Sequence, residues 1–448
     1  MTTEILELID DLKQYVQEQE WDKAIDLLSQ FRAPDQAQAF TELDRAEQKE
    51  LFPNLDEEKQ ADLFEHLKKE DVRRLSQEID RDTLLPILDN VGPDVAADVL
   101  QSFPPQESHE ILEGMEEKEQ VSPLLSYSED TAGGLMTPEV LTLPSRMTAA
   151  RALDRLRRLK PPQGTVEVLY VVDRRNRPQG TLTLRQLILA DPEEKISEVM
   201  NPDVIFVTAD TDREECARIM SRHDLSALPV IDDEGRLLGI IRLKESLEVA
   251  EEEATEDMYH MVGVSENERI LTPFRDSIRR RLPWLSINLG TAILAGVVVG
   301  LFESTIAQVA ALAVFIPVIA GQGGNAGAQT LTIMVRSLAL GEVSFRNAKR
   351  ALFKELGLAA INGLVIAVIA GNIAFFWKDD LWLAVVLGGA MFATMIVAGL
   401  SGVVIPLLLK LMKVDPALGS TVVVTTITDT GGLLIMLGMA TLMISYLV

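Results

Sequence analysis

Cysteine and histidine are scarce in this chain of 448 residues. Its one cysteine, Cys216, excludes a disulfide framework and favours a reducing compartment. No cysteine or histidine lies in the long apolar stretches, and the four histidines lack the spacing of a zinc site, which disfavours a soft transition-metal centre. The sequence also lacks a nucleophile–base set and a phosphate-binding loop, so we do not expect an enzyme.

Lysine and arginine are few relative to aspartate and glutamate over the first part of the chain. Residues 1–278 hold 61 Asp and Glu against 31 Lys and Arg, a net charge of −30, whereas residues 279–448 hold 7 against 11. A charge of −30 repels phosphates, which argues against nucleic acid as a partner, and it is compatible with cation binding. The first residues, MTTEILELIDDLK, lack a basic segment followed by an apolar one, so we expect no signal peptide.

Residues 1–125 show apolar residues at helical spacing and a weak repeat. The segments QADLFEHL (60–67) and AADVLQSF (96–103) lie 36 residues apart. Stacked helical pairs of this kind form a superhelix. We therefore predict an all-α, acidic N-terminal domain over 1–125.

Residues 126–245 contain two similar halves, and each reads as Met-x-Pro, short strand, helix, apolar strand, polar turn, strand and helix. The apolar strands are expected at Val168–Val172 and Leu228–Ile231. This duplication resembles a tandem pair of cystathionine-β-synthase (CBS) modules, which implies an α/β fold. CBS pairs often bind adenosine nucleotides through a Gly-x-x-Ser/Thr-x-x-Asp run. Here Gln186 replaces the Asp of the first run and Arg242 the hydroxyl residue of the second, so ATP is expected to bind weakly or not at all.

An acidic connecting helix is predicted over 246–275. Its carboxylates crowd two to three turns: Glu248, Glu251, Glu252, Glu253, Glu256 and Asp257. Like charges at i, i+4 destabilise a helix. A bound cation would offset that repulsion, and plain solvation is the alternative.

Five apolar stretches follow within 276–448, each near or above the ~20 residues that cross a bilayer. They cover residues 283–302, 308–335, 351–376, 381–409 and 420–446, and the basic residues gather before the first, between the second and third, and between the fourth and fifth. Because such residues face the cytoplasm, we predict a multi-pass cell-membrane protein with five transmembrane helices, its N-terminus in the cytoplasm and its C-terminus outside.

The last apolar stretch holds a carboxylate, Asp429, far from either end. A charge at that depth is costly and by default marks a functional site. Thr421 and Thr425 precede it at helical spacing, so one stripe of the helix suits a wet path. A protonated Asp429 bonded to a neighbouring helix is the alternative.

A second stripe lies in the stretch 308–335, where Gly321, Asn325, Ala328 and Thr332 share a helix face. Small residues let helices approach closely, and Asn325 offers an amide oxygen. Packing is the alternative role for the glycines; beside Asp429, we predict that this face lines an ion path. Mg²⁺ keeps several waters and prefers oxygen ligands, so one carboxylate with hydroxyls and carbonyls suits the hydrated ion.

Taken together, the chain resembles the MgtE family of Mg²⁺ transporters over nearly its full length. The motifs that carry the resemblance are SYSEDTAGGLMTPE (126–139), EEEATEDMY (251–259), IPVIAGQGGNAGAQ (316–329) and TTITDTGG (425–432). The resemblance implies a homodimer with the pore between protomers and an ion site at Asp429. It also implies that cytoplasmic Mg²⁺ bridges acids of the N-domain, the CBS pair and the connecting "plug" helix, and thereby shuts the pore. The candidate metal ligands are Asp62, Asp94, Asp98, Asp232, Glu252, Glu256, Asp257 and Asp429.

The second CBS strand departs from the family pattern. The family usually continues this strand into a TVDD-like run, whereas here the chain reads Arg242-Leu243-Lys244-Glu245. A lysine beside a cation site weakens it, so Mg²⁺ sensing is less tight or rests more on Asp62, Asp98 and the acids of the connecting helix. Two other functions stay open: a secondary active exchanger for the same ion, and a nucleotide-sensing membrane scaffold without a pore.

Overall fold

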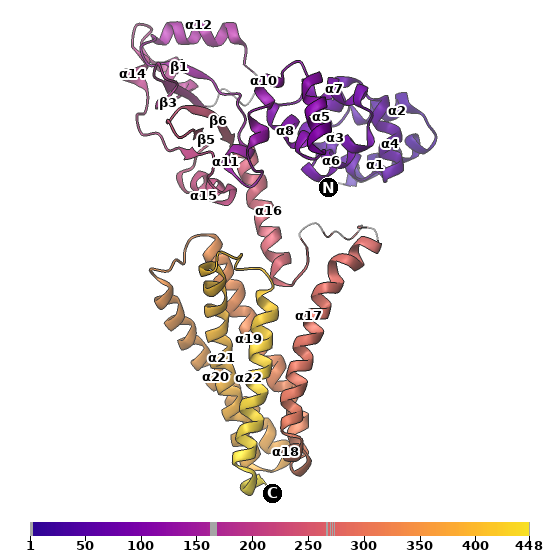
Figure 1. Ribbon diagram of the computed structural model, residues 1–448, viewed down its shortest axis with the longest axis vertical. Helices are drawn as coiled ribbons and strands as arrows, with labels where there is room; N and C mark the ends of the chain where they lie inside the picture. The colour runs from indigo at the N-terminus through magenta and orange to yellow at the C-terminus, as the bar shows by residue number, and fades with distance from the viewer. Residues whose placement is uncertain are drawn as a thin grey trace. The chain divides into compact units, whose positions relative to one another are not determined.

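The computed structural model describes residues 3–161, 168–265, 268, 270, 272 and 274–447, with the side chains of residues 3–8 left aside. The chain forms two compact units, Met1–Ala250 and Glu251–Val448. The first unit is a helical array beside an α/β part, and the second is a bundle of long helices (Figure 1). The predicted fold class is confirmed.

Short helices and 3₁₀ turns wind through the N-terminal part of the first unit. Phe40, Phe52 and Phe64, each 12 residues apart, stack through it with ring centroids 6.1 and 5.7 Å apart. The carboxylates of Asp56 and Asp80 cap the helices that follow them by accepting backbone N–H groups. The elements are α1 (Thr3–Gln17), α2 (Trp21–Leu28), α3 (Ala33–Thr41), α4 (Arg45–Leu51), η1 (Phe52–Asn54), α5 (Glu57–His66), α6 (Lys69–Glu78), α7 (Arg81–Asn90), α8 (Pro93–Gln101), α9 (Pro105–Gly114), α10 (Lys118–Val121) and η2 (Leu124–Ser126).

The duplicated segment folds into two three-stranded sheets, ordered β1-β2-β3 and β4-β5-β6, each with one parallel and one antiparallel pair. The strand expected at Val168–Val172 is β2 as predicted, and that expected at Leu228–Ile231 begins one residue earlier. The elements are α11 (Ala132–Leu135), β1 (Thr142–Pro144), α12 (Ala149–Leu159), β2 (Val168–Val172), β3 (Pro178–Thr183), α13 (Leu184–Leu189), α14 (Ile196–Val199), β4 (Val207–Thr208), α15 (Arg213–His223), β5 (Ala227–Ile231) and β6 (Leu237–Arg242).

Each half contributes one residue that pairs through its backbone with a strand of the other half. Thr137, ahead of the first sheet, pairs with Ile240 in β6 through two hydrogen bonds of 2.9 Å. Asn201, ahead of the second sheet, pairs with Thr181 in β3 at 2.8 and 2.9 Å. The buried apolar core of the second half continues into the N-terminal helices, so these two parts share one core, whereas the first half has a core of its own.

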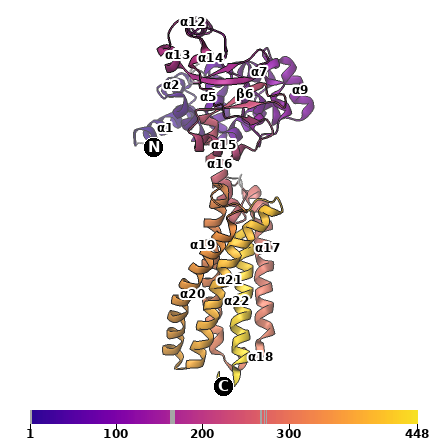
Figure 2. The ribbon, with the colours of Figure 1, turned by 90° about the vertical axis from the view of Figure 1, so that its left-hand side faces the viewer.

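A long helix, α16 (Leu243–Met261), leaves β6 without a break, starting three residues before the predicted connecting helix and ending at Met261. Within the described part of the chain, five helices are long and apolar enough to cross a membrane, as predicted. They run side by side (Figure 2), with short α18 (Glu303–Gln308) and α23 (Ile444–Leu447) between and after them. They are α17 (Phe274–Leu301), α19 (Ala311–Ala339), α20 (Ala348–Lys378), α21 (Leu381–Leu411) and α22 (Ser420–Leu442).

Small residues let these helices approach closely. A Cβ added at Gly371 of α20 would lie 3.2 Å from the carbonyl oxygen of Ala384 in α21, and one at Gly388 would lie 3.2 Å from that of Ala367. Such backbone contact replaces hydrophobic driving force inside a bilayer. The buried Glu355 pairs with Lys354 at 3.2 Å.

Candidate functional site

A polar cavity lies between α17 and α22, two of the helices that are long and apolar enough to cross a membrane. Its volume is about 300 Å³. Its lining carries the carboxylate of Asp429, the amide of Asn288 and four threonine hydroxyls. The lining residues are Val262, Asn288, Thr291, Ala292, Thr421, Val422, Thr425, Thr426 and Asp429.

Two of the cavity's threonines on α22 donate their hydroxyl protons to carbonyl oxygens of their own helix. Thr425 Oγ1 donates to the carbonyl oxygen of Thr421 at 2.9 Å, and Thr426 Oγ1 donates to that of Val422 at 2.6 Å. Each hydroxyl oxygen therefore keeps acceptor capacity. The cavity thus offers carboxylate, amide and hydroxyl oxygens, the ligand set of a hard, hydrated cation.

The structure brings three of the predicted pathway residues together, since Thr421, Thr425 and Asp429 all line this cavity. The other four lie on a different helix, α19: Gly321, Asn325 and Thr332 are exposed in the single chain, and Ala328 is partly buried.

Gly324 of α19 lies close to Asp429. A Cβ added at Gly324 would lie 3.6 Å from Thr425 and 3.8 Å from the Oδ1 of Asp429. The polar face of α17, Asn288 and Thr291, was missed by the sequence reasoning. Its signal was an i, i+3 polar pair within an apolar stretch.

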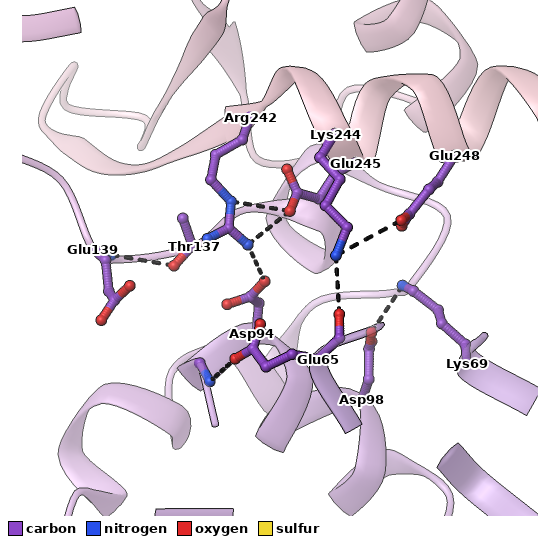
Figure 3. Close-up of polar contacts among 11 residues, drawn as sticks. Glu65, Lys69, Asp94, Asp98, Thr137, Glu139, Arg242, Lys244, Glu245 and Glu248 are labelled. Atoms are coloured by element: carbon purple, nitrogen blue, oxygen red, sulfur yellow. Dashed lines mark hydrogen bonds and ion pairs between the residues drawn. The ribbon is translucent and has the colours of Figure 1, made fainter. Parts of the chain in front are cut away.

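A second polar cluster lies in the first unit, where β6 and α16 meet α5 and α8 (Figure 3). Arg242 Nη2 donates to Asp94 Oδ2 at 2.9 Å, and Arg242 Nε donates to Glu245 Oε1 at 2.9 Å. Lys244 Nζ donates to the carbonyl oxygen of Glu65 at 2.9 Å. Burial raises the pKa of Asp94 to about 6, against the opposing charge of Arg242.

The remaining predicted metal ligands of the first unit have other surroundings. Asp98 pairs with Lys69 at 2.8 Å. Asp232 fixes the turn before β6, because its carboxylate accepts the backbone N–H groups of Glu234 at 3.0 Å and Arg236 at 2.7 Å. Asp62 is exposed on α5. Over residues 3–161, 168–265 and 274–447, no three His, Cys, Asp or Glu side chains gather closely enough to hold a metal ion.

The predicted ligands of α16 lie in the second unit, near the loop before α22. His260 Nδ1 lies 2.9 Å from Asp415 Oδ2 and 3.6 Å from Glu256 Oε1. Burial raises the pKa of Asp257 to about 6, and the charges of Asp415 and Glu253 act in the same direction. Glu252 is exposed on the same helix. This end of α16 therefore concentrates negative charge.

The two positions that break the nucleotide motif both have structural partners. The Oε1 of Gln186 accepts the backbone N–H of Thr183 at 2.8 Å and so completes a capping box at the start of α13. Arg242 is engaged by Asp94 and Glu245. Both side chains are therefore engaged in contacts within the protein.

Three family models match the chain. Residues 31–130 match the MgtE intracellular N domain, 132–193 and 196–245 match the CBS domain, and 316–439 match the MgtE divalent cation transporter. The domain matches follow the order predicted from the sequence.

Characterised relatives and solved structures agree with these matches. The magnesium transporter MgtE of Thermus thermophilus is 38% identical over 330 residues, 73% of each chain, and that of Bacillus subtilis is 33% identical over 325 residues, 72% of each chain. A crystal structure of the cytosolic domain of the Mg²⁺ channel MgtE in complex with ATP is 34% identical and covers 54% of this chain and 99% of its own, with a TM-score of 0.50. The soluble part of a magnesium transporter is 26% identical, covers 56% and 99%, and has a TM-score of 0.50. The order of the matched domains and the identities to the two transporters over more than 70% of each chain establish that this chain belongs to the MgtE family of magnesium transporters.

Proposed function

We propose that this protein is a Mg²⁺-selective channel that conducts hydrated Mg²⁺ past Asp429, in a homodimer whose pore lies between the protomers. The observation that carries the proposal is the polar cavity around Asp429, set among helices that are otherwise apolar. A carboxylate at this depth carries a free-energy cost, so it is by default a functional residue.

The size and chemistry of the cavity suit a hydrated ion. A water molecule takes about 30 Å³ of liquid volume, so six waters take roughly 180 Å³, less than the 300 Å³ of the cavity. Mg²⁺ holds its waters tightly and is bound through one or two carboxylates. Asp429 supplies the charge, and the threonine and asparagine oxygens accept hydrogen bonds from the ion's waters.

Exposure of polar groups on α19 supports the homodimer. Gly321, Asn325 and Thr332 lie on a face of α19 that the single chain leaves uncovered. Lipid cannot hydrogen-bond the Asn325 amide. A second copy opposite this face, with water between the two, would give the amide polar surroundings and would place two Asp429 carboxylates on one path.

Regulation by cytoplasmic Mg²⁺ completes the proposal. In this proposal the chain has four parts: an N-terminal acidic domain (1–125), a CBS pair (126–245), a connecting segment (246–275) that holds most of α16, and a membrane domain (276–448). The acids Glu252, Glu256 and Asp257 of α16 attract Mg²⁺, and the bound ion stabilises the closed pore. Positive loop residues keep the N-terminus in the cytoplasm, which leaves the C-terminus outside after five spans.

The test is Mg²⁺ flux into liposomes that contain the purified protein and a Mg²⁺-sensitive dye. Asp429→Ala should abolish flux, and Asp429→Asn, which keeps the shape and removes the charge, should lose most of it. Asp379→Asn is the matched control, since it removes an exposed carboxylate at the end of α20.

The same assay separates the rival functions. A channel conducts down the Mg²⁺ gradient alone, whereas an exchanger requires an imposed Na⁺ or H⁺ gradient, and a scaffold gives no flux under either condition. Normal flux through Asp429→Ala would defeat the pore assignment.

A further inference from the structure

We propose that Arg242 and Lys244 act as built-in cations that hold the N-terminal helices on the second CBS module, so that this docking does not require Mg²⁺. The proposal rests on the proposed function, because it concerns which part of the chain responds to the regulatory ion.

Arg242 joins acids that come from two separate parts of the first unit. Its Nη2 lies 2.9 Å from Asp94 Oδ2 at the start of α8 and 2.6 Å from Glu245 Oε1 at the start of α16. Only 12% of the Asp94 side chain and 14% of the Glu245 side chain are exposed. The guanidinium thus bridges two largely buried carboxylates across the seam where the N-terminal helices meet the second CBS module (Figure 3).

Lys244 makes a second link across the same seam. Its ammonium donates to the main-chain carbonyl of Glu65 at the end of α5 and lies 3.8 Å from Glu248 on its own helix. The Glu65 carboxylate in turn accepts the N–H of Gly92 at 2.6 Å, which ties α5 to the turn before α8. Arg242 and Lys244 therefore contact two N-terminal helices from one short stretch of chain.

The residues present do not fit a Mg²⁺ ion between Asp94 and Glu245. Mg²⁺ demands near-octahedral oxygen ligands at about 2.0–2.1 Å. Arg242 occupies one oxygen of each carboxylate, which leaves only Asp94 Oδ1 and Glu245 Oε2, and the described residues bring no third acidic side chain close enough to complete a metal site. A guanidinium stays charged at all physiological pH values and would repel an incoming cation. The nearby Asp98 is likewise paired, with Lys69 at 2.8 Å.

A tethered cation differs from a free one in its response to concentration. An ion leaves when the cytoplasmic concentration falls, whereas a side chain keeps a constant effective concentration at its partners. The shared apolar core between the N-terminal helices and the second module adds a contact that is also independent of ions. Docking at this seam should therefore be constitutive, and the Mg²⁺ response should lie with the acids of α16.

Hydrogen–deuterium exchange on the full-length protein in nanodiscs tests this, with one arm in EDTA and one in 10 mM Mg²⁺. The reporting peptides cover α8 and residues 239–249. In the wild type, their exchange rates should agree within twofold between the two arms. In Arg242→Gln/Lys244→Gln, exchange in EDTA should be at least tenfold faster and should slow again in Mg²⁺, because the freed carboxylates repel one another until an ion joins them.

Two controls protect the result against misfolding. Arg236→Gln removes an arginine whose contacts stay within its own turn, at Asp232 and Glu234, and should leave both peptides unchanged. Peptides from β2 and β3 must keep wild-type protection in the double variant. If they lose protection, the double variant is replaced by Arg242→Lys, which retains the positive charge. In EDTA, its exchange rate should lie between that of the wild type and the tenfold faster rate expected without the two cations.

A wild-type seam that opens at least tenfold in EDTA and closes in Mg²⁺ would overturn the proposal, and so would a double variant with unchanged exchange. Flux through Asp429 is measured separately. Loss of the channel function would leave the exchange result standing, and the reverse also holds.

Discussion

The amide of Gly419 donates a 2.9 Å hydrogen bond to the carbonyl oxygen of His260, which ties the first turn of α22 to the end of α16. The His260 side chain reaches Asp415 in the loop just before that turn, also at 2.9 Å. The connecting helix is thus fastened by backbone and side chain to the helix that carries Asp429. A movement of the end of α16 would therefore act directly on α22, which lines the proposed ion path.

Trp284 of α17 also packs where the end of α16 meets the start of α22, a contact region that we call the joint. We expect Trp284 to be needed for closure of the pore. A Cβ added at Gly263 would lie 2.8 Å from the indole, and one at Gly419 would lie 2.6 Å from it; both glycines have positive φ, at 71° and 59°. Removing the ring leaves a gap at the meeting point of three helices. Trp284→Ala should leave open-state flux near wild type and reduce its inhibition by Mg²⁺ severalfold in liposomes.

Trp382→Ala is the matched control for Trp284. Trp382 stacks on Tyr446 with centroids 4.8 Å apart, away from the joint, so its loss should leave Mg²⁺ inhibition unchanged. Wild-type inhibition in Trp284→Ala would show that the indole only fills space.

Neutralising the acids at the end of α16 should keep the pore open at high Mg²⁺. The change is Glu252→Gln/Glu256→Gln/Asp257→Asn, read as flux in millimolar Mg²⁺. The physical reason is that an ion stabilises the closed state only through its better binding to that state. Protease protection of the wild type by Mg²⁺ should be concentrated in residues 251–280.

A solvated acidic surface gives a different pattern from a sensor. Screening alone depends on ionic strength, so Na⁺ at matched ionic strength would then protect as well as Mg²⁺. Equal protection by the two salts, or a triple variant that closes normally, would rule out sensing by these residues.

ATP should bind weakly or not at all, because Gln186 is used as a helix cap and Arg242 is held by two carboxylates. Isothermal titration of the full-length protein should show no heat at micromolar ATP. Gln186→Asp keeps a side chain that can cap the helix and restores the ribose partner of the motif, so it should strengthen binding if the motif reading is right. Micromolar affinity in the wild type would contradict the prediction.

Cys216 should not react with maleimides in the folded protein. Its thiol is fully buried in the second CBS module, and burial raises its pKa to about 12. The thiolate is the reactive form, so raising the pH from 7 to 9 leaves the group neutral and the rate low. Labelling should become complete in denaturant, and Ser29→Cys, at an exposed position, serves as the reactive control.

Local patterns were sufficient for much of this structure. The apolar strand Val168–Val172 is followed by turn residues, and the five membrane-spanning helices are recognisable from the length of their apolar stretches. The stripe of Thr421, Thr425 and Asp429 was readable because residues at helical spacing share a face whatever the surroundings.

Contacts between distant residues were not readable in the same way. The partners Asp94 and Arg242 are 148 positions apart, so no spacing rule could pair them. The sequence showed that Arg242 and Lys244 depart from the family pattern. Their partners on α5 and α8, however, depend on how the domains pack. For the same reason, the sequence could not show that Gly324 lies near Asp429 while Asn325 is exposed in the single chain, since the rotation of α19 is set by its neighbours.

The pairing of backbone between the two halves of the α/β part has a consequence for either half taken alone. Thr137 pairs with β6 of the second half and Asn201 pairs with β3 of the first, so a fragment that held only one half would leave an edge of its sheet without this partner. The two halves therefore depend on each other through main-chain contacts. Such contacts do not constrain side chains, and the two halves differ in theirs, as at Gln186 and Arg242.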